Sequence, residues 1–280
     1  MPKFGVNLLL WADKFDRESV ALIPPVAEMG FDGVEIPVFD PKTVDIAHTK
    51  SVLDDLGLEV LTCAIMGPDR DPISDDPSVR QNGKDYLKSC VEVTAELGGD
   101  TFIGPMYSAV GRLVGRGRTD QEWNWCVDAL SDVAEHARRY EVRLGIEPLN
   151  RFETYFINIA EDAVNLAKVI DNPYLGVHLD TFHMNIEEKN QAASIRKAGK
   201  HLGHFHACGS DRGTPGNDHI DWVPIVKALK GIRYKGDIVI ESFTTDVKVI
   251  ARAAAIWRRM EPTREEIAVK GLKFLKKAFK

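Results

Sequence analysis

The segment Leu175-Gly176-Val177-His178-Leu179-Asp180 is a short apolar run that ends on a carboxylate. Three more segments share this pattern: Arg143-Leu144-Gly145-Ile146 before Glu147, Leu202-Gly203-His204-Phe205 before His206, and Asp237-Ile238-Val239-Ile240 before Glu241. A strand is this apolar when both of its faces are packed, and a charged residue at its end then costs solvation energy. We therefore interpret the four segments as buried strands whose ends form one site.

Apolar runs of this kind recur along the chain and alternate with segments of helical periodicity. The runs lie near residues 4–10, 33–38, 59–65, 101–105, 143–148, 175–180, 203–207 and 237–242. The helical segments lie near 17–29, 43–56, 76–97, 120–140, 160–170, 187–199, 222–230 and 246–256. This alternation predicts an α/β fold, a (β/α)₈ TIM barrel formed by a single domain over residues 1–280, with an extra C-terminal helix near 263–279.

A doubly wound sheet is the alternative fold, and it usually carries a glycine-rich phosphate loop after the first strand. Here that position reads Leu8-Leu9-Leu10-Trp11-Ala12-Asp13, without glycine. The segment 111–118 is rich in glycine and arginine, but it follows the fourth run and lacks the Lys-Ser/Thr ending of a phosphate loop. We interpret this segment as a mobile surface loop.

The composition is that of a soluble globular protein, with 44% hydrophobic and 28% charged residues. The net charge of −6 argues against a nucleic-acid partner, because such binding depends on cationic contacts. The basic cluster at 270–280 has an amphipathic pattern, which favours a closing helix. The four cysteines form no C-x-x-C pair, and no apolar stretch approaches about 18 residues, so we expect neither a disulfide framework nor a membrane span, and a cytoplasmic location.

The C-terminal ends of all barrel strands meet on one face. Glu147, Asp180, His206 and Glu241 end four consecutive strands, so we expect them to surround one point. Any one of them alone would be an ordinary polar residue at a strand-to-loop boundary, but four in a row make that interpretation poor. Carboxylate oxygens with one imidazole are ligands that a divalent metal uses. The sequence thus predicts one divalent ion per chain.

Four further residues lie near these strand ends. His178 and His204 are one step deeper on the same strand faces, and we interpret them as core histidines or supports of the ligands. His183 follows the sixth strand, where we expect a loop that faces the substrate. Glu35 ends an apolar strand on the opposite side of the barrel from the cluster, as a structural carboxylate or a substrate contact.

The segments 145–153 (GIEPLNRFE) and 179–188 (LDTFHMNIEE), with His206 followed by Arg212 and by Pro215-Gly216, resemble the ketose 3-epimerases that act on D-tagatose, D-psicose (allulose) or L-ribulose. The resemblance spans the whole chain. It implies that Glu147, Asp180, His206 and Glu241 bind Mn²⁺ or Co²⁺, with Mg²⁺ as an alternative, and that the substrate is held by Glu153, His183, Arg212 and Trp11. The residues Asn7–Leu10 depart from the aromatic residues common in this family, so the preferred ketose is left open.

The implied reaction is epimerisation of a free ketose at carbon 3 through a cis-enediolate, with Glu147 and Glu241 as the two bases. His183 and Arg212 would polarise oxygens 1 and 2, while Glu153 would orient His183 or accept from a sugar hydroxyl. An aldose–ketose isomerase, or an inosose-type isomerase or dehydratase, is the main alternative on the same scaffold. A silent sugar-binding protein has no need of both bases.

A three-zinc abasic-site endonuclease is a further alternative, but it needs histidines after the third and fourth strands. The segments 64–67 and 103–106 contain none. We also expect a homodimer or homotetramer, in which Ile256, Trp257 and Met260 on a late helix would supply an apolar contact.

Overall fold

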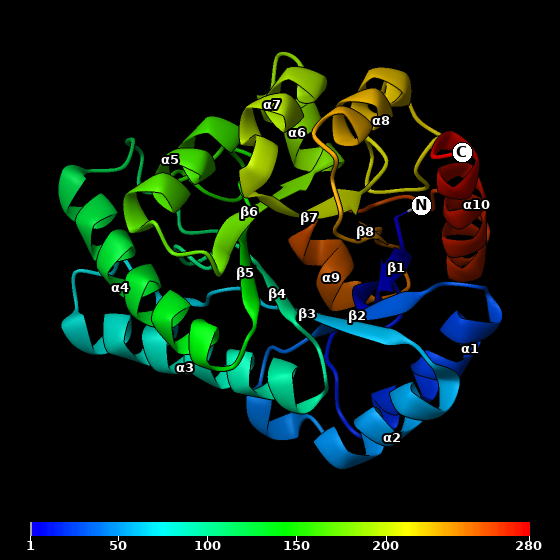
Figure 1. Ribbon diagram of the computed structural model, residues 1–280, viewed down its shortest axis with the longest axis horizontal. Coiled ribbons are helices and arrows are strands. Elements are labelled where there is room, and N and C mark those ends of the chain that lie inside the picture. Colours follow the sequence, from blue (N-terminus) through cyan, green and yellow to red (C-terminus); the bar gives the residue numbers. More distant parts are fainter. Residues whose placement is uncertain (1) are drawn as a thin grey trace.

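The computed structural model describes residues 2–280, and residue 1 of the predicted domain lies outside the described part. Eight parallel strands form a closed barrel in sequence order (Figure 1). They are β1 (Phe4–Asn7), β2 (Gly33–Pro37), β3 (Glu59–Cys63), β4 (Thr101–Gly104), β5 (Arg143–Ile146), β6 (Leu175–Asp180), β7 (Leu202–Ala207) and β8 (Ile238–Ile240). The predicted (β/α)₈ barrel is therefore confirmed.

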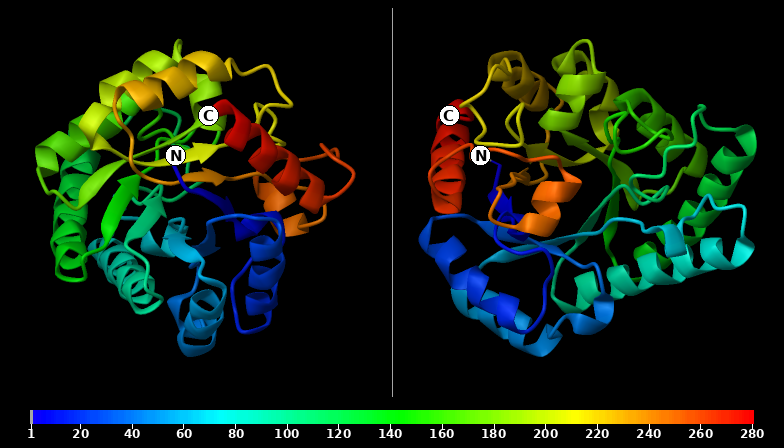
Figure 2. Two further views of the ribbon diagram at one scale, coloured as in Figure 1. Left: turned by 45° about the vertical axis from the view of Figure 1, so that its right-hand side comes forward. Right: turned by 180° about the vertical axis from the view of Figure 1, so that it is seen from behind.

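The helices form a ring around this barrel in all three views (Figures 1 and 2). They are α1 (Ile23–Glu28), α2 (Ile46–Leu56), α3 (Pro77–Glu96), α4 (Asp120–Arg139), α5 (Ala160–Ile170), α6 (Thr181–Glu187), α7 (Gln191–Ala198), α8 (Trp222–Gly231), α9 (Lys248–Ala253) and α10 (Arg264–Ala278). The amphipathic helix α10 closes the ring against β1 and β8, and the ring of Phe279 packs edge to face on Phe4 at 5.9 Å. No helix within residues 2–280 is long and apolar enough to cross a bilayer.

The strand register determines which side chains emerge at the same level. Asp180 on β6 pairs with His206 on β7, and two residues earlier His178 pairs with His204. Asn7 at the end of β1 pairs with Glu35 on β2. Because inward-pointing side chains alternate along each strand, these pairs form successive layers inside the barrel.

Three expected elements differ from the structure. The first strand ends at Asn7, because the Asn7 side chain accepts a hydrogen bond from the Leu9 N–H and residues Leu8–Leu10 turn into a 3₁₀ helix. The helix expected near 187–199 is the shorter α7, and α6 is an additional helix that begins directly after Asp180. The helix expected near 246–256 is the shorter α9, so Trp257 lies beyond its end.

The glycine- and arginine-rich segment 111–118 is held by ion pairs. Arg112 pairs with Asp71 at 2.8 Å, and Arg118 forms two hydrogen bonds of 2.9 Å with Asp162 at the start of α5. Arg116 forms two hydrogen bonds of 2.9 Å with Glu122. Three attachments to the barrel wall do not fit our interpretation of this segment as a mobile loop.

Glu122, the partner of Arg116, is buried. It forms a capping box with Thr119 at the start of α4, and it also accepts a hydrogen bond from the Tyr155 hydroxyl at 2.7 Å. Although burial opposes ionisation, the hydrogen bonds from Arg116, Tyr155 and Thr119 lower the pKa of the Glu122 carboxyl to about 2. The folded state therefore favours the ionised carboxylate.

Glu122→Gln is expected to destabilise the protein by about 2–3 kcal/mol at neutral pH, since the variant loses this preference for the charged form. The contribution is complete above about pH 5, where the unfolded chain is also ionised, and it is lost as the pH falls towards 2. Urea denaturation gives the free energy of unfolding of the variant and of wild type at pH 7 and at pH 3. The difference between the two proteins should be smaller at pH 3. Glu135→Gln is the control: this α4 residue is 43% exposed in its pair with Arg138, so water screens the pair and its loss should change the free energy of unfolding far less than Glu122→Gln does. An equal difference at both pH values for Glu122→Gln would contradict the prediction.

Candidate active site

Four buried side chains converge at the C-terminal face of the barrel. Glu147 follows β5, Asp180 ends β6, His206 lies near the end of β7, and Glu241 follows β8. Each offers one ligand atom, and these atoms all lie within 4.8 Å of one another. The alignment of Asp180 with His206 in the sheet explains why neighbouring strands deliver their side chains to one point.

Arg212, in the loop after β7, lies among these residues. Its Nη1 donates to Asp180 Oδ2 at 2.6 Å and to Glu241 Oε2 at 2.7 Å. The guanidinium is stacked between the rings of Phe182 and Phe243, at 4.1 and 4.9 Å from their centroids. This arrangement holds a permanent cation beside two of the carboxylates.

His183 lies in α6, and not in the loop that we expected. The Asn150 backbone N–H donates to His183 Nδ1 at 3.0 Å, which leaves the ring proton on Nε2. That Nε2 lies 2.8 Å from Arg212 Nη2, which is also a donor. The Asn150 side chain contacts His183 Nδ1 at 3.0 Å and donates to Glu153 Oε1 at 2.7 Å, so Glu153 acts on His183 through Asn150.

Glu35 on β2 lies across the barrel from β6, as we expected, but its carboxylate reaches the histidines of β7. Its carboxylate crosses the barrel interior and lies 3.0 Å from His206 Nε2 and 3.0 Å from His204 Nε2. Asn7 donates to Glu35 Oε1 at 2.7 Å and fixes its orientation. β2 and β7 are three places apart around the closed barrel, and in so narrow a barrel their inward side chains meet in the core.

The cluster is short of positive charge. Burial and the charge of Glu241 raise the pKa of Glu147 well above its usual range, and burial raises the pKa of Asp180 to about 6 despite Arg212. The pKa of Glu241 is lowered, because His206 and Arg212 outweigh its burial. Within residues 2–280, Glu147 Oε1 and His206 Nδ1 are buried without a hydrogen-bond partner. A divalent cation fits this set, since it would balance the carboxylates and engage both free atoms.

A family model described as "Xylose isomerase-like TIM barrel" matches residues 23–278. A probable ketose 3-epimerase of Synechocystis sp. is 33% identical over 277 residues, which cover 99% of this chain and 96% of the relative. The chain is a ketose 3-epimerase family member. It is accordingly an isomerase of the carbohydrate epimerase class.

Other ketose 3-epimerases are similar over their full length. An L-ribulose 3-epimerase of Methylomonas sp. is 30% identical, covering 99% of this chain and 98% of the relative. The crystal structure of a D-allulose 3-epimerase from Methylomonas sp. has a TM-score of 0.95 at 29% identity, covering 99% of this chain and 98% of that one.

A cavity of about 670 Å³ lies among the loops that follow β5, β6, β7 and β8. Its lining includes Asn150 and Glu153 after β5, Phe182 after β6, and residues 253–258 after β8. Trp11 is not among the lining residues within the described part of the chain. Its indole N–H donates to Glu265 at the start of α10, 2.9 Å away.

Sequence reasoning missed three contributors to this ketose 3-epimerase site. Asn150 connects Glu153 to His183, while Phe182 and Phe243 stack on Arg212. Phe182 and Phe243 each follow a predicted ligand by two residues, and that spacing was an available signal. The role of Asn150 had no signal, because it depends on the position of α6.

Proposed function

We propose that this protein interconverts free ketoses that are epimeric at carbon 3, in a reaction that depends on a divalent ion held by Glu147, Asp180, His206 and Glu241. The observation that carries the proposal is the presence of Glu147 and Glu241 in one buried cluster of four ligand atoms within 4.8 Å. D-psicose (D-allulose) and L-ribulose appear in the names of its relatives, which supports a ketose substrate here.

The reaction requires removal of a weakly acidic proton from carbon 3, next to the carbonyl at carbon 2. A divalent ion such as Mn²⁺ or Co²⁺, if held by Glu147, Asp180, His206 and Glu241, would supply Lewis-acid stabilisation of the negative charge that develops on the sugar oxygens in a cis-enediolate mechanism. Because the proton must return on the opposite face, two bases are needed. Glu147 from β5 and Glu241 from β8 approach the cluster from strands three places apart in the barrel, which suits action on opposite faces.

The donors around the cluster support a role in holding the sugar. His183 Nε2 and Arg212 Nη2 are both donors, yet they lie 2.8 Å apart without an acceptor between them. A carbonyl or enediolate oxygen from the substrate satisfies both, which suits polarisation of oxygens 1 and 2. Glu153 keeps His183 oriented through Asn150 and lines the cavity, where it can accept from a sugar hydroxyl.

The test is incubation of the Mn²⁺-loaded protein with a panel of ketohexoses and ketopentoses in D₂O. Chromatography should find only the carbon 3 epimer of each accepted ketose, and NMR should find deuterium at carbon 3. An aldose product, with hydrogen moved between carbons 1 and 2, would instead identify an aldose–ketose isomerase. Loss of water would identify the inosose-type dehydratase.

We further propose that the protein forms a homodimer or homotetramer. Trp257 is 74% exposed and Phe152 is 71% exposed, and both line the 670 Å³ cavity. Two large exposed aromatic rings at one mouth are typical of a surface that a second copy covers. Light scattering measures the oligomeric state. A monomer at micromolar concentration would contradict the proposed homodimer or homotetramer.

A further inference from the structure

The barrel interior holds a carboxylate that is not one of the four candidate ligands. Glu35 on β2 is fully buried, and its oxygens lie 3.0 Å from Nε2 of His206 and 3.0 Å from Nε2 of His204. Barrel interiors are normally filled by branched apolar side chains, and an ionised carboxylate is costly there unless its hydrogen bonds are satisfied. Its polar neighbours are themselves buried, so Glu35 acts on other residues of the core and not directly on a substrate.

Asn7 at the end of β1 fixes the direction of this carboxylate. The backbone N–H of Leu9 donates to Asn7 Oδ1 at 2.8 Å, and this contact identifies the other end of the amide as the donor. Asn7 Nδ2 donates to Glu35 Oε1 at 2.7 Å. The turn that ends β1 therefore also orients Glu35, because one side chain makes both hydrogen bonds.

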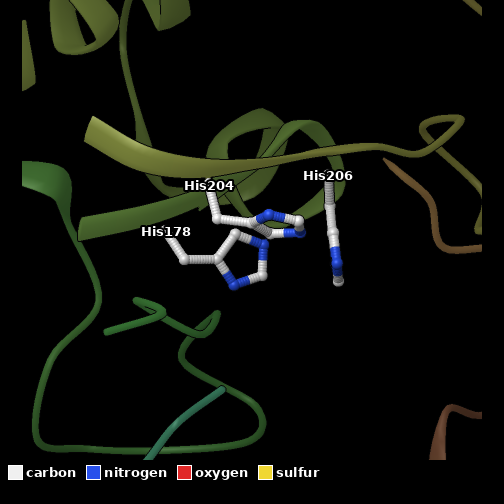
Figure 3. A group of neighbouring side chains, drawn as sticks. All are labelled: His178, His204 and His206. Atoms are coloured by element: carbon white, nitrogen blue, oxygen red, sulfur yellow. The ribbon is translucent and has the colours of Figure 1, made fainter. Parts of the chain in front are cut away.

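The ring of His206 is held by packing as well as by Glu35. The ring centroid of His178 lies 4.1 Å from that of His206, and the ring centroid of His204 lies 4.9 Å from it, both edge to face (Figure 3). Such packing fixes the plane of an imidazole, but a half-turn of the ring exchanges nitrogen for carbon with almost no change in shape. A polar contact is needed to distinguish the two positions of the ring.

We propose that Glu35, oriented by Asn7, is a positioning residue for the metal site and acts through His206; the inference rests on the proposed function. Nε2 of His206 donates to the Glu35 carboxylate, so the neutral ring carries its lone pair on Nδ1. That Nδ1 faces the four-ligand cluster, 3.5 Å from Glu241 Oε2. Glu35 thereby selects both the ring position and the tautomer in which His206 can bind a divalent ion.

The test is the affinity for Mn²⁺, measured by isothermal titration without sugar in wild type, E35Q, H206F and E35Q/H206F. Glutamine keeps the size of Glu35, but one amide oxygen replaces two carboxylate oxygens and the negative charge is lost. E35Q should weaken Mn²⁺ binding by about 10–100-fold in the otherwise native chain. In the H206F background, adding E35Q should change the affinity by less than about twofold, because the residue through which Glu35 acts is gone.

Glu122→Gln is the matched control, since Glu122 is also a buried carboxylate that accepts several hydrogen bonds, but it lies on α4 outside the barrel interior. It should lower the Tm measured without metal and leave the Mn²⁺ affinity within about twofold of wild type. An unchanged affinity in E35Q, or an equal loss in the native and H206F backgrounds, would overturn the proposal. Wild type that binds Mn²⁺ but epimerises no ketose would contradict the proposed function alone.

Asn7→Ala gives an independent test if H206F does not fold. This substitution removes the donor that orients Glu35, while Glu35 and His206 both stay in the chain. Mn²⁺ affinity should fall in Asn7→Ala, and combining it with E35Q should cause no further loss, because both changes act on the same hydrogen bond to His206. Additive losses in the double variant would overturn the proposal.

Discussion

Glu147→Gln and Glu241→Gln should each reduce epimerisation by about 10²–10⁴-fold, because each removes one of the two bases that the reaction needs. Glutamine keeps the shape and an oxygen that can still contact the metal, so metal binding should suffer less than turnover. Conversion of a ketose to its carbon 3 epimer, measured by chromatography under Mn²⁺ saturation, gives the loss directly.

Exchange of the carbon 3 proton separates the two bases. One variant should still exchange the proton of one epimer with solvent deuterium, and the other variant that of the opposite epimer, since one base remains in each. Glu261→Gln is the matched control: Glu261 is a buried carboxylate paired with Lys270, outside the cluster, and its turnover should stay within about twofold of wild type. Full epimerase turnover in either Glu147→Gln or Glu241→Gln would eliminate the two-base scheme.

Asp180→Asn should weaken Mn²⁺ binding by about 100-fold, because a hard anionic ligand becomes neutral. At a Mn²⁺ concentration 100 times the wild-type Kd, binding stabilises the wild type by about 2.7 kcal/mol and such a variant by about 0.4 kcal/mol. Thermal unfolding with and without Mn²⁺ should therefore show a large rise in Tm only for wild type. Isothermal titration gives the two dissociation constants.

The substitution carries its own structural control. Asp180 is also the N-cap of α6, where Oδ1 accepts from the Phe182 N–H at 2.8 Å. Asparagine caps helices about as well as aspartate, so α6 should remain in place. An unchanged Mn²⁺ affinity in Asp180→Asn would remove this residue from the ligand set, whereas a lower Tm without Mn²⁺ would indicate damage to α6.

The barrel could be predicted from the sequence because each strand and each helix is recognisable from a short stretch of residues. Each strand is an apolar run and each helix a periodic segment, so Leu175–Asp180 and its seven counterparts are visible without knowledge of the rest. The run Leu8–Leu10 was misassigned for the same reason: it is as apolar as a strand. Its turn depends on one hydrogen bond from Leu9 to the Asn7 side chain.

The only part of the site that the sequence predicted is the set of residues at the C-terminal ends of the strands. Glu147, Asp180, His206 and Glu241 needed only the rule that parallel strands end on one face. The contact of Glu35 with His206 was not predicted because it crosses the barrel, and no local pattern records which inward side chains meet there. The contact between Arg212 and Asp180 likewise depends on a loop whose path the sequence does not reveal.

The four ligands come from β5 to β8, and within residues 2–280 the strands β1 to β4 add none to that group. Under the proposed function, one half of the barrel rim supplies the metal ligands and both bases, and the loops of the other half supply none of them. We expect substitutions of the exposed residues Ile65 and Leu113, in the loops after β3 and β4, to leave metal binding unchanged. In a protein divided in this way, substitutions in one half of the rim can change the preferred sugar while the metal ligands and the bases in the other half stay the same.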